Sequence, residues 1–307
     1  MRRSPALRNG SRISLVAPAG PLAPGAVDRA IVRAHAWGWV PIIGEHARGR
    51  HGYLAGTDEQ RAADFNEALR SLDNDAIWCL RGGYGTMRII DRLDWWALSE
   101  RPRPLIGFSD NTALHLAAQR AGVISFHGPH PAAENLPDFA ERGLLDALTG
   151  AVATGPLPFP AGGPERGVTV TGGTAEGPLV GGNLSLIAAT LGTPYQIRAE
   201  GAILFLEEVG EPAYRIDRLL SQLRLAGVLH SVAGVVVGAF SECPEDSDET
   251  PAAEEVLRDR LQDLEVPVAT GFPFGHVPES WTIPMGVKAR LDADAGTLSL
   301  LEKGVSP

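Results

Sequence analysis

The sequence predicts an α/β fold, with a doubly wound, mostly parallel sheet in an N-terminal domain and a second α/β domain after it. The chain has 307 residues, 44% of them hydrophobic and 21% charged, enough for one large α/β unit or two ordinary domains. Short apolar, β-branched runs alternate with amphipathic stretches through the first half, which is typical of a parallel sheet covered by helices. A segment rich in Gly, Pro and Thr then separates the halves, which indicates two domains.

In the first domain, placed over residues 1–150, short apolar runs predict strands and amphipathic stretches predict helices. The expected strands are Ile13–Ala17, Val40–Ile43, Ala76–Leu80 and Leu105–Phe108. The expected helices are Val27–Trp37, Asp58–Leu72, Thr86–Leu93 and Thr112–Ala121. Thr57 is expected to cap the second helix, and Gly122 to end the fourth. This order predicts a sheet of the Rossmann or flavodoxin-like kind.

The segment 151–182 is expected to be a linker, because Pro and Gly are closely spaced in it. The second domain then covers residues 183–307. Its expected helices are Leu184–Leu191 and Ile216–Ala226, and its expected strands are Ala202–Leu206 and Val232–Phe240. Seven acidic residues between Glu242 and Glu255 are interpreted as a surface loop or helix entry rather than a metal site.

Charge and composition exclude several classes of protein. The 27 basic and 37 acidic residues give a formal net charge of −10, which argues against a nucleic-acid binder and leaves small molecules or peptides as ligands. No apolar run approaches the roughly 18 residues of a membrane span, and none of signal-peptide length follows the N-terminus. Cys79 and Cys243, the only cysteines, are interpreted as reduced thiols, so the expected location is the cytoplasm.

The segment Gly107–Thr112, Gly-Phe-Ser-Asp-Asn-Thr, is the sharpest chemical feature. An apolar strand stops there, and a helix begins within three residues of Ser109. Such an elbow exposes the serine hydroxyl above a helix N-terminus, where the dipole and the N–H of Asp110 can stabilise an oxyanion. Because the segment does not match Gly-x-Ser-x-Gly, a helix-capping role for these residues remains the alternative.

A glycine-rich loop, Arg81-Gly82-Gly83-Tyr84-Gly85, follows the strand that ends at Leu80. Its backbone can approach a ligand closely, and in a doubly wound sheet it emerges at the same strand ends as Ser109. The loop lacks the Lys-Ser/Thr ending of a P-loop and the full Gly-x-Gly-x-x-Gly spacing, so phosphate binding is the weaker interpretation. A plain tight turn is the other alternative.

A serine nucleophile needs a base. His276 is the first candidate because it ends the Gly- and Pro-punctuated loop 271–276. His127 and His130 flank Gly128-Pro129, but the proline denies them a shared helical face and no third metal ligand is evident. The five other histidines, including His115, are interpreted as surface residues.

The base needs an orienting acid, and Glu207 or Glu208 is the candidate because both follow a buried apolar strand. Strand alternation sends the two side chains to opposite sides, so only one can serve a given site. A structural salt bridge to Arg215 or Arg218 is the alternative for either carboxylate.

Four motifs, in this order, resemble the LD-carboxypeptidases, serine peptidases of cytoplasmic murein recycling. They are Arg-Gly-Gly-Tyr-Gly at 81–85, Gly-Phe-Ser-Asp-x-Thr at 107–112, Leu-Glu-Glu-Val-Gly-Glu-Pro-x-Tyr-Arg-Ile-Asp-Arg at 206–218 and Phe-Pro-Phe-Gly-His at 272–276. The resemblance extends from Val16-Ala17-Pro18-Ala19-Gly20 to Pro284-Met285-Gly286.

The resemblance implies that the first domain carries the nucleophile, that a C-terminal domain with a β-rich core carries the other triad members, and that the active site lies at their interface, commonly in a homodimer. It assigns these roles: nucleophile Ser109, general base His276, orienting acid Glu207, oxyanion donors Asp110 and Gly83, and substrate contacts Arg81 and Gly82. The implied substrate is a murein tetrapeptide that loses its terminal D-alanine, and no metal or cofactor is implied. A cation for the substrate carboxylate would come from Arg81, Arg215, Arg218 or Lys288.

Three other functions remain as alternatives. One is an immunity-type peptidase of the same superfamily, similar to those that cleave microcin C or other aminoacyl-nucleotide conjugates. Another is a non-catalytic sugar- or nucleotide-binding protein in which Ser109 only caps a helix. A thiol amidotransferase that uses Cys79 is the weakest, because Cys79 lies inside an apolar strand and not on an elbow.

Overall fold

The computed structural model describes residues 1–152, 154–244 and 251–307. The chain divides into two compact units. Unit 1 comprises Met1–Ala153, Thr282–Met285 and Lys303–Pro307, and unit 2 comprises Thr154–Trp281 and Gly286–Glu302. None of the helices in the described residues combines the length and the apolar character that a membrane crossing requires.

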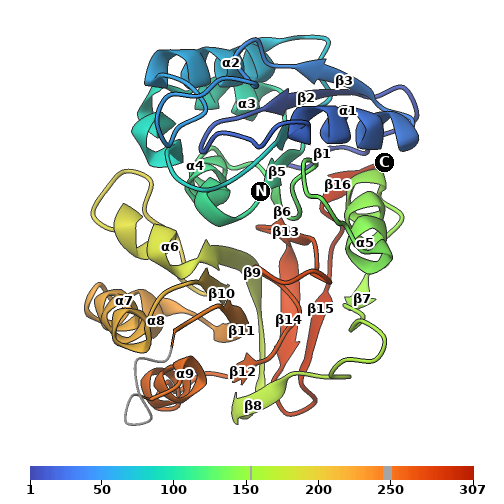
Figure 1. Ribbon diagram of the computed structural model, residues 1–307. Helices are drawn as coiled ribbons and strands as arrows, with labels where there is room; N and C mark the ends of the chain where they lie inside the picture. The colour runs from blue at the N-terminus through green and yellow to red at the C-terminus, as the bar shows by residue number, and fades with distance from the viewer. Residues whose placement is uncertain (153, 245–250) are drawn as a thin grey trace. The chain divides into compact units, whose positions relative to one another are not determined.

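Unit 1 is built on a sheet with the strand order β13-β6-β5-β4-β2-β3 (Figure 1). Its strands are β2 (Arg12–Val16), β3 (Val40–Ile43), β4 (Ala76–Cys79), β5 (Leu105–Gly107), β6 (Ser125–His127) and β13 (Ile283–Met285). Neighbours are parallel except β13, which pairs antiparallel with β6. A separate parallel pair joins β1 (Ser4–Pro5) to β16 (Val305–Ser306). The parallel strands thus have the flavodoxin-like order, in which ligands bind at the carboxyl ends of the strands.

Helices cover both faces of this sheet. They are α1 (Ala26–Ala36), α2 (Asp58–Arg70), α3 (Trp95–Glu100), α4 (Thr112–Arg120) and α5 (Asp138–Thr149). Apolar residues of α2, α3 and α4 share one buried cluster with Ile77 and Cys79 of β4. Trp78 alternates to the other face and stacks on Trp37, which follows α1, with ring centroids 5.2 Å apart. Trp37 Nε1 also donates to Glu141 of α5, so α1 and α5 cover the second face.

The predicted α/β class with a doubly wound, mostly parallel sheet is confirmed. Thr57 caps α2 in a reciprocal capping box with Gln60, as its position before the helix predicts. The predicted helix Thr86–Leu93 is wrong, because this segment forms two short 3₁₀ turns, η1 (Thr86–Arg88) and η2 (Ile90–Arg92). The side chains of Asn66 and Trp95 donate hydrogen bonds to the carbonyls of Arg92 and Ile90 in the second turn. These side-chain bonds take the place of the backbone bonds that would extend the turn into a helix.

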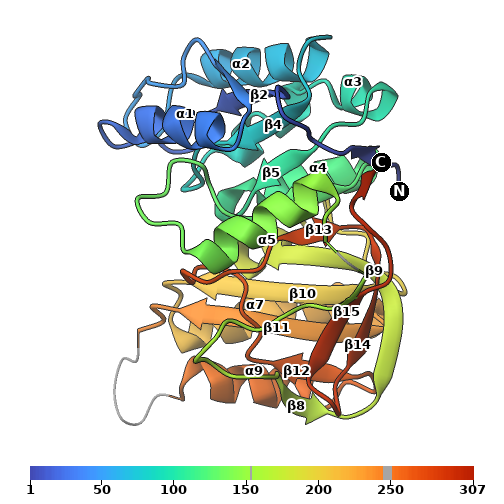
Figure 2. The ribbon, with the colours of Figure 1, turned by 90° about the vertical axis from the view of Figure 1, so that its right-hand side faces the viewer.

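Unit 2 contains a mixed sheet with the order β7-β15-β14-β9-β10-β11-β12-β8. Its strands are β7 (Gly155–Pro156), β8 (Val168–Thr171), β9 (Thr174–Asn183), β10 (Ile203–Val209), β11 (Gly234–Ser241), β12 (Val268–Thr270), β14 (Lys288–Asp292) and β15 (Thr297–Leu300). The strands β9 to β12 run parallel, and Figure 2 shows them side by side. The helices are α6 (Leu184–Thr190), α7 (Ala213–Leu225), α8 (Val228–Ser231) and α9 (Ala253–Leu261), of which α6 and α9 both pack on α7.

The expectation of a linker over 151–182 is corrected by these strands. Parts of that segment form β7, β8 and β9. The strand β9 lies inside the sheet because it pairs with β10 on one side and β14 on the other. The segments Thr282–Met285 and Lys303–Pro307 fall within the range expected for the second domain, but they belong to unit 1 and contain β13 and β16. Of the acidic segment, Glu254 and Glu255 lie in the first turn of α9, whereas residues 245–250 lie outside the described residues.

Candidate active site

Ser109 lies on a sharp turn between β5 and α4, at the carboxyl edge of the unit 1 sheet. The strand ends at Gly107, and one 3₁₀ turn, η3 (Ser109–Asn111), leads into the helix. Ser109 has a φ of 62°, a left-handed value shared by only one other non-glycine residue in the described part of the chain. Such a backbone costs about 1–3 kcal/mol and persists only where the surroundings impose it. The strand-to-helix elbow that the sequence predicts is therefore present and strained.

The glycine loop passes directly against Ser109. A Cβ built on Gly82 would lie 2.9 Å from Ser109 Cβ and 3.1 Å from Ser109 Oγ, so no larger residue fits without a shift. The carbonyl of Gly82 accepts the N–H of Gly20 at 3.0 Å, which ties the loop to the segment after β2. Gly83 has a φ of 104°, which a side chain would strain. The glycines at 82 and 83 therefore allow the loop backbone to approach Ser109 closely.

Asp110 joins the elbow to the glycine loop. Its side chain is nearly buried, with the residue 2% exposed, and Oδ2 accepts the N–H of Thr86 at 2.9 Å. The Thr86 hydroxyl in turn donates to the Asp110 carbonyl at 2.6 Å. Burial raises the pKa of the Asp110 carboxyl, while the bonds from Thr86 oppose that rise. The sequence assigned Asp110 only a backbone role, and it offered no signal for this link, which joins side chains far apart along the chain.

His115 is buried and contacts the end of β5 just before the elbow, which corrects its interpretation as a surface residue. It is buried in α4, where Nε2 lies 2.8 Å from the carbonyl of Gly107 and Nδ1 lies 2.9 Å from Ser125 Oγ. Burial lowers the pKa of His115 to about 4, so the ring is neutral near pH 7. A neutral ring that donates from Nε2 to Gly107 accepts the Ser125 hydroxyl at Nδ1, and it fixes the end of β5 just before Ser109.

Glu207 and His276 form a close pair in unit 2. His276 Nδ1 lies 2.7 Å from Glu207 Oε2, and Glu207 is completely buried. Burial raises the pKa of Glu207, whereas its hydrogen bond and charge interaction with His276 lower it. With an ionised Glu207, Nδ1 carries the proton and donates it to the carboxylate, which leaves Nε2 as an acceptor. The pair therefore has the arrangement of an oriented general base.

Local backbone geometry separates the two consecutive glutamates. The pairing of β10 with β11 shifts register between Leu206 and Glu208, so a bulge lies at Glu207. Glu208 turns away from His276, and its carboxylate accepts Asn183 Nδ2 at 2.7 Å and the N–H of Ser185 at 2.8 Å. The same Asn183 caps α6, a role that the Gly-Gly-Asn sequence before the helix could have suggested.

Neither glutamate forms the salt bridge considered as an alternative. Arg215 pairs with Glu211 at 3.3 Å, and the Arg218 guanidinium lies 5.3 Å from the centre of the Tyr214 ring. Both arginines are therefore engaged on α7 and its entry.

The loop that carries His276 packs tightly on the strands below it. Gly275 has a φ of 104°, and a Cβ there would lie 2.7 Å from Glu207 Cβ. The preceding Phe274 packs edge-on against Phe205 of β10, with ring centroids 5.5 Å apart. Gly275 therefore lets the loop pass close to Glu207, and the packing of Phe274 on Phe205 holds the loop against β10.

The remaining candidates have other partners. His130 Nδ1 lies 2.9 Å from the carbonyl of Cys79, and its ring lies 4.6 Å from that of Phe108. Within residues 1–152, 154–244 and 251–307, no three His, Cys, Asp or Glu side chains gather as a metal site. Cys79 is buried and burial raises the pKa of its thiol, which makes it a poor nucleophile. Lys288 pairs with Glu176 at 2.9 Å.

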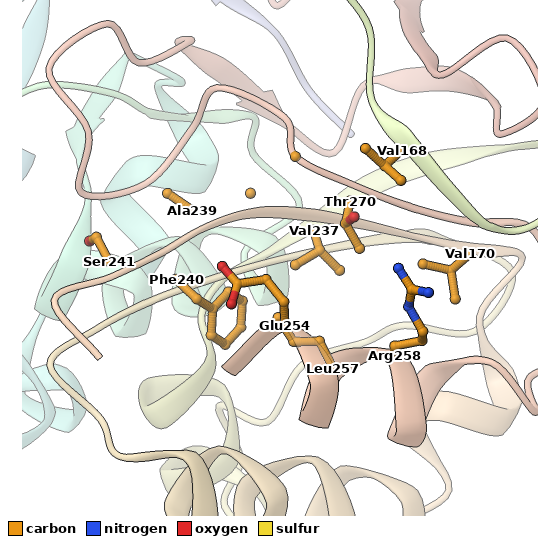
Figure 3. A pocket seen from close by; sticks show the side chains of 12 residues that line it. Val168, Val170, Val237, Ala239, Phe240, Ser241, Glu254, Leu257, Arg258 and Thr270 are labelled. Carbon is orange, nitrogen blue, oxygen red and sulfur yellow. The ribbon is translucent and has the colours of Figure 1, made fainter. Parts of the chain in front are cut away.

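A cavity of about 400 Å³ lies in unit 2 beside α9 (Figure 3). Its walls come from β11, from the end of β12 and from β8, and Glu254 and Arg258 of α9 complete them. Glu207 and His276 do not line it. The cavity is therefore separate from the candidate base.

The predicted triad is divided between the units, since Ser109 belongs to unit 1 and both Glu207 and His276 belong to unit 2. Comparison with known proteins also divides the chain into two parts. The profile of the LD-carboxypeptidase N-terminal domain matches residues 13–128, and that of the LD-carboxypeptidase C-terminal domain matches residues 176–291.

Individual relatives match along nearly the whole chain. The murein tetrapeptide carboxypeptidase of Pseudomonas aeruginosa is 35% identical over 289 residues, covering 92% of this chain and 94% of that protein. The solved muramoyltetrapeptide carboxypeptidase of Oxalobacter formigenes is 30% identical with a TM-score of 0.83, covering 94% of this chain and 98% of that one. The microcin C7 self-immunity protein MccF, solved in complex with aspartyl sulfamoyl adenosine, is 25% identical with a TM-score of 0.90 and covers 100% of both chains. The chain belongs to the LD-carboxypeptidase family and is an enzyme of the serine carboxypeptidase class.

Proposed function

We propose that this enzyme hydrolyses the L,D-peptide bond of murein tetrapeptides and releases the terminal D-alanine, as a homodimer in cytoplasmic peptidoglycan recycling. The observation that carries the proposal is the strained elbow at Ser109, with its φ of 62° and the glycine loop against it. Strain of this kind at a half-buried serine on a strand-to-helix turn is typical of a nucleophile held for attack. The murein and muramoyl tetrapeptide carboxypeptidases among the relatives support the choice of substrate.

Acylation is the first half of the proposed reaction. Nε2 of His276 removes the proton of the Ser109 hydroxyl, and the oxygen attacks the carbonyl carbon of the L,D bond. The N–H groups of Asp110 and Gly83 stabilise the oxyanion, each worth on the order of 3 kcal/mol of barrier. The C–N bond then breaks as His276 gives its proton to the departing amine. Glu207 stabilises the imidazolium through Nδ1 during both transfers.

Deacylation returns the enzyme to its starting state. His276 removes a proton from water, the hydroxide attacks the ester carbonyl, and the bond to Ser109 Oγ breaks as the oxygen regains a proton. The products are D-alanine and a peptide shortened by one residue. This mechanism requires the Ser109 hydroxyl and His276 Nε2 to come within hydrogen-bond distance, about 2.6–3.2 Å, during turnover.

Mass spectrometry of a murein tetrapeptide tests the proposal. We expect the wild-type enzyme to remove the mass of one D-alanine residue, and Ser109→Ala and His276→Ala to leave the peptide intact while remaining folded by circular dichroism. Capture of the peptide as a Ser109 ester after rapid acid quenching would support the acyl-enzyme. An intact peptide after incubation with the wild-type enzyme would reject the substrate.

Cleavage of aminoacyl-nucleotide conjugates is the second candidate function. It is favoured by the full-length match to MccF, which was solved with aspartyl sulfamoyl adenosine. Parallel assays with the tetrapeptide and with an aminoacyl sulfamoyl adenosine separate the two functions. We expect kcat/KM to be higher for the tetrapeptide, and the reverse order would transfer the assignment to the nucleotide conjugates.

A further inference from the structure

A cavity of about 320 Å³ lies in unit 1 next to the elbow. Phe108, the residue before Ser109, and Arg81, the first residue of the glycine loop, both line it. The other lining residues are Leu22, Ala23, Ala26, Arg29, Leu80, His130, Ala132, Ala133 and Glu134. Pockets of this size suit a small ligand or one part of a larger one. Because Phe108 directly precedes Ser109 and Arg81 directly precedes Gly82, which contacts Ser109, an occupant of the cavity would lie near the reacting carbonyl.

Two guanidinium groups give this cavity its charge. Arg81 is exposed, and its side chain donates only to the carbonyl of Pro21, with no acidic partner anywhere in the described part of the chain. Arg29 lies 3.6 Å from Glu134, whose side chain is 81% exposed, and it reaches the carbonyl of Ala132 at 3.4 Å. Such an exposed pair contributes about 0–1 kcal/mol and holds its partner weakly. The cavity therefore has positive charge that the protein leaves largely uncompensated.

Two further observations indicate that an anion would be bound there. Nε of Arg29 is buried without a hydrogen-bond partner, which is costly unless a ligand supplies one. The helix α1 begins at Ala26 in the cavity wall, and its N-cap, Gly25, offers no side-chain cap. The positive end of the α1 helix dipole adds to the potential in this part of the wall.

We propose that this cavity binds a carboxylate of the substrate between Arg29 and Arg81, a proposal that rests on the proposed peptidase function. A guanidinium binds a carboxylate through two parallel hydrogen bonds, which fixes orientation as well as position. Two sources of the carboxylate fit the chemistry: the α-carboxylate of the departing D-alanine, or a carboxylate on the side chain of the residue before it. Glu134 at the rim would accept an ammonium group if that side chain carries one.

Arg33 provides a matched control for a merely structural role. It lies one turn after Arg29 on α1 and donates to the carbonyls of Pro131 and Ala133, so it holds the same loop. It does not line the cavity. If Arg29 only supported the loop, Arg29→Gln and Arg33→Gln would have the same effect on catalysis.

Kinetics with three substrates test the proposal. These are a tetrapeptide with diaminopimelate before D-alanine, the same peptide with a C-terminal amide, and a peptide with lysine in place of diaminopimelate. We expect Arg81→Gln and Arg29→Gln to raise KM for the first peptide at least tenfold, with a smaller change in kcat, while Arg33→Gln leaves KM unchanged. In the Ser109→Ala background, calorimetry of the same peptide should show a Kd raised by a similar factor.

The substrate comparison distinguishes the two sources. A wild-type preference for the acid over the amide that disappears in Arg81→Gln identifies the terminal carboxylate. A wild-type preference for diaminopimelate over lysine that disappears in the arginine variants identifies the side-chain carboxylate as the bound group. An active wild type whose preferences survive in both arginine variants overturns this proposal and leaves the peptidase function intact. An inactive wild type overturns the peptidase function itself.

Discussion

Nδ1 of His276 lies 2.7 Å from Oε2 of Glu207, whereas the next residue, Glu208, is bonded to Asn183. The bulge at Glu207 directs the two neighbouring carboxylates to different partners. Glu207 is therefore expected to affect catalysis and Glu208 to affect stability, and substitution of each residue can distinguish the two effects.

Replacing each glutamate by glutamine tests this difference. We expect Glu207→Gln to lower kcat by about 10⁴-fold, because the amide no longer selects the tautomer with the proton on Nδ1. Glu208→Gln should instead lower the free energy of unfolding by about 1.5–3 kcal/mol, the value of bonds to a charged group, with a far smaller change in kcat. Steady-state kinetics and urea unfolding measure the two effects. Equal losses of kcat would contradict the assignment of Glu207.

Gly82 leaves no room for a side chain beside Ser109. We expect Gly82→Ala to abolish most of the activity while the protein stays folded, because the new Cβ would lie 2.9 Å from Ser109 Cβ. Gly143→Ala is the control, since a Cβ there meets nothing within 4 Å and helix α5 should gain about 0.5–1 kcal/mol. D-alanine release and thermal unfolding measure the outcome. Full activity in Gly82→Ala would show that the loop does not constrain the serine.

The Asp110 side chain is a positioning group, because it bonds the N–H of Thr86 and acts on the substrate only through the loop. We expect Asp110→Ala to lower kcat by roughly 100-fold with little change in KM, as displaced donors stabilise the transition state less. The unpaired N–H should also cost about 1–3 kcal/mol of stability. Asp110→Asn keeps one acceptor oxygen and should recover part of both losses. An increase in KM alone would point to ground-state binding instead.

His115 makes the stability of unit 1 depend on pH. Burial lowers the pKa of His115 to about 4 in the folded state, against an ordinary value of 6.5, so below pH 6.5 the unfolded chain binds a proton that the folded chain does not. Stability from this group is complete above pH 6.5 and is lost as the pH falls toward 4, by up to about 3 kcal/mol. Urea unfolding between these pH values should show a shallower decline in His115→Gln than in the wild type. Parallel declines would exclude His115 as the cause.

Local patterns predicted the regular elements because their causes are local. The alternation of apolar runs and amphipathic stretches located β2 to β5 and three of the four expected N-terminal helices, and Thr57 as N-cap placed a helix start. The segment Thr86–Leu93 has a helical pattern, yet Asp110, Asn66 and Trp95 bind its backbone from elsewhere in the chain. Long-range bonds of this kind leave no periodic signal in the sequence.

The candidate site shows the same limit. The Gly-Phe-Ser-Asp segment predicted the elbow, because a short strand followed at once by a helix requires a sharp turn. The arrangement of Glu207 and Glu208 depends on a bulge defined by the pairing of β10 with β11, and periodicity alone does not reveal where a bulge occurs. The charged cavity joins Arg29 to Arg81, which are brought together only by the tertiary fold.

The strand β13, which pairs antiparallel with β6, forms the outer strand of the unit 1 sheet. It is translated only after almost all of unit 2. A nascent chain that has emerged only as far as Ala153 lacks this strand and exposes the hydrogen-bonding edge of β6. Synthesis therefore passes through an interval in which the nucleophile's scaffold is unfinished and open to strand addition by other chains. Fragments cut at the apparent boundary would retain that vulnerability permanently.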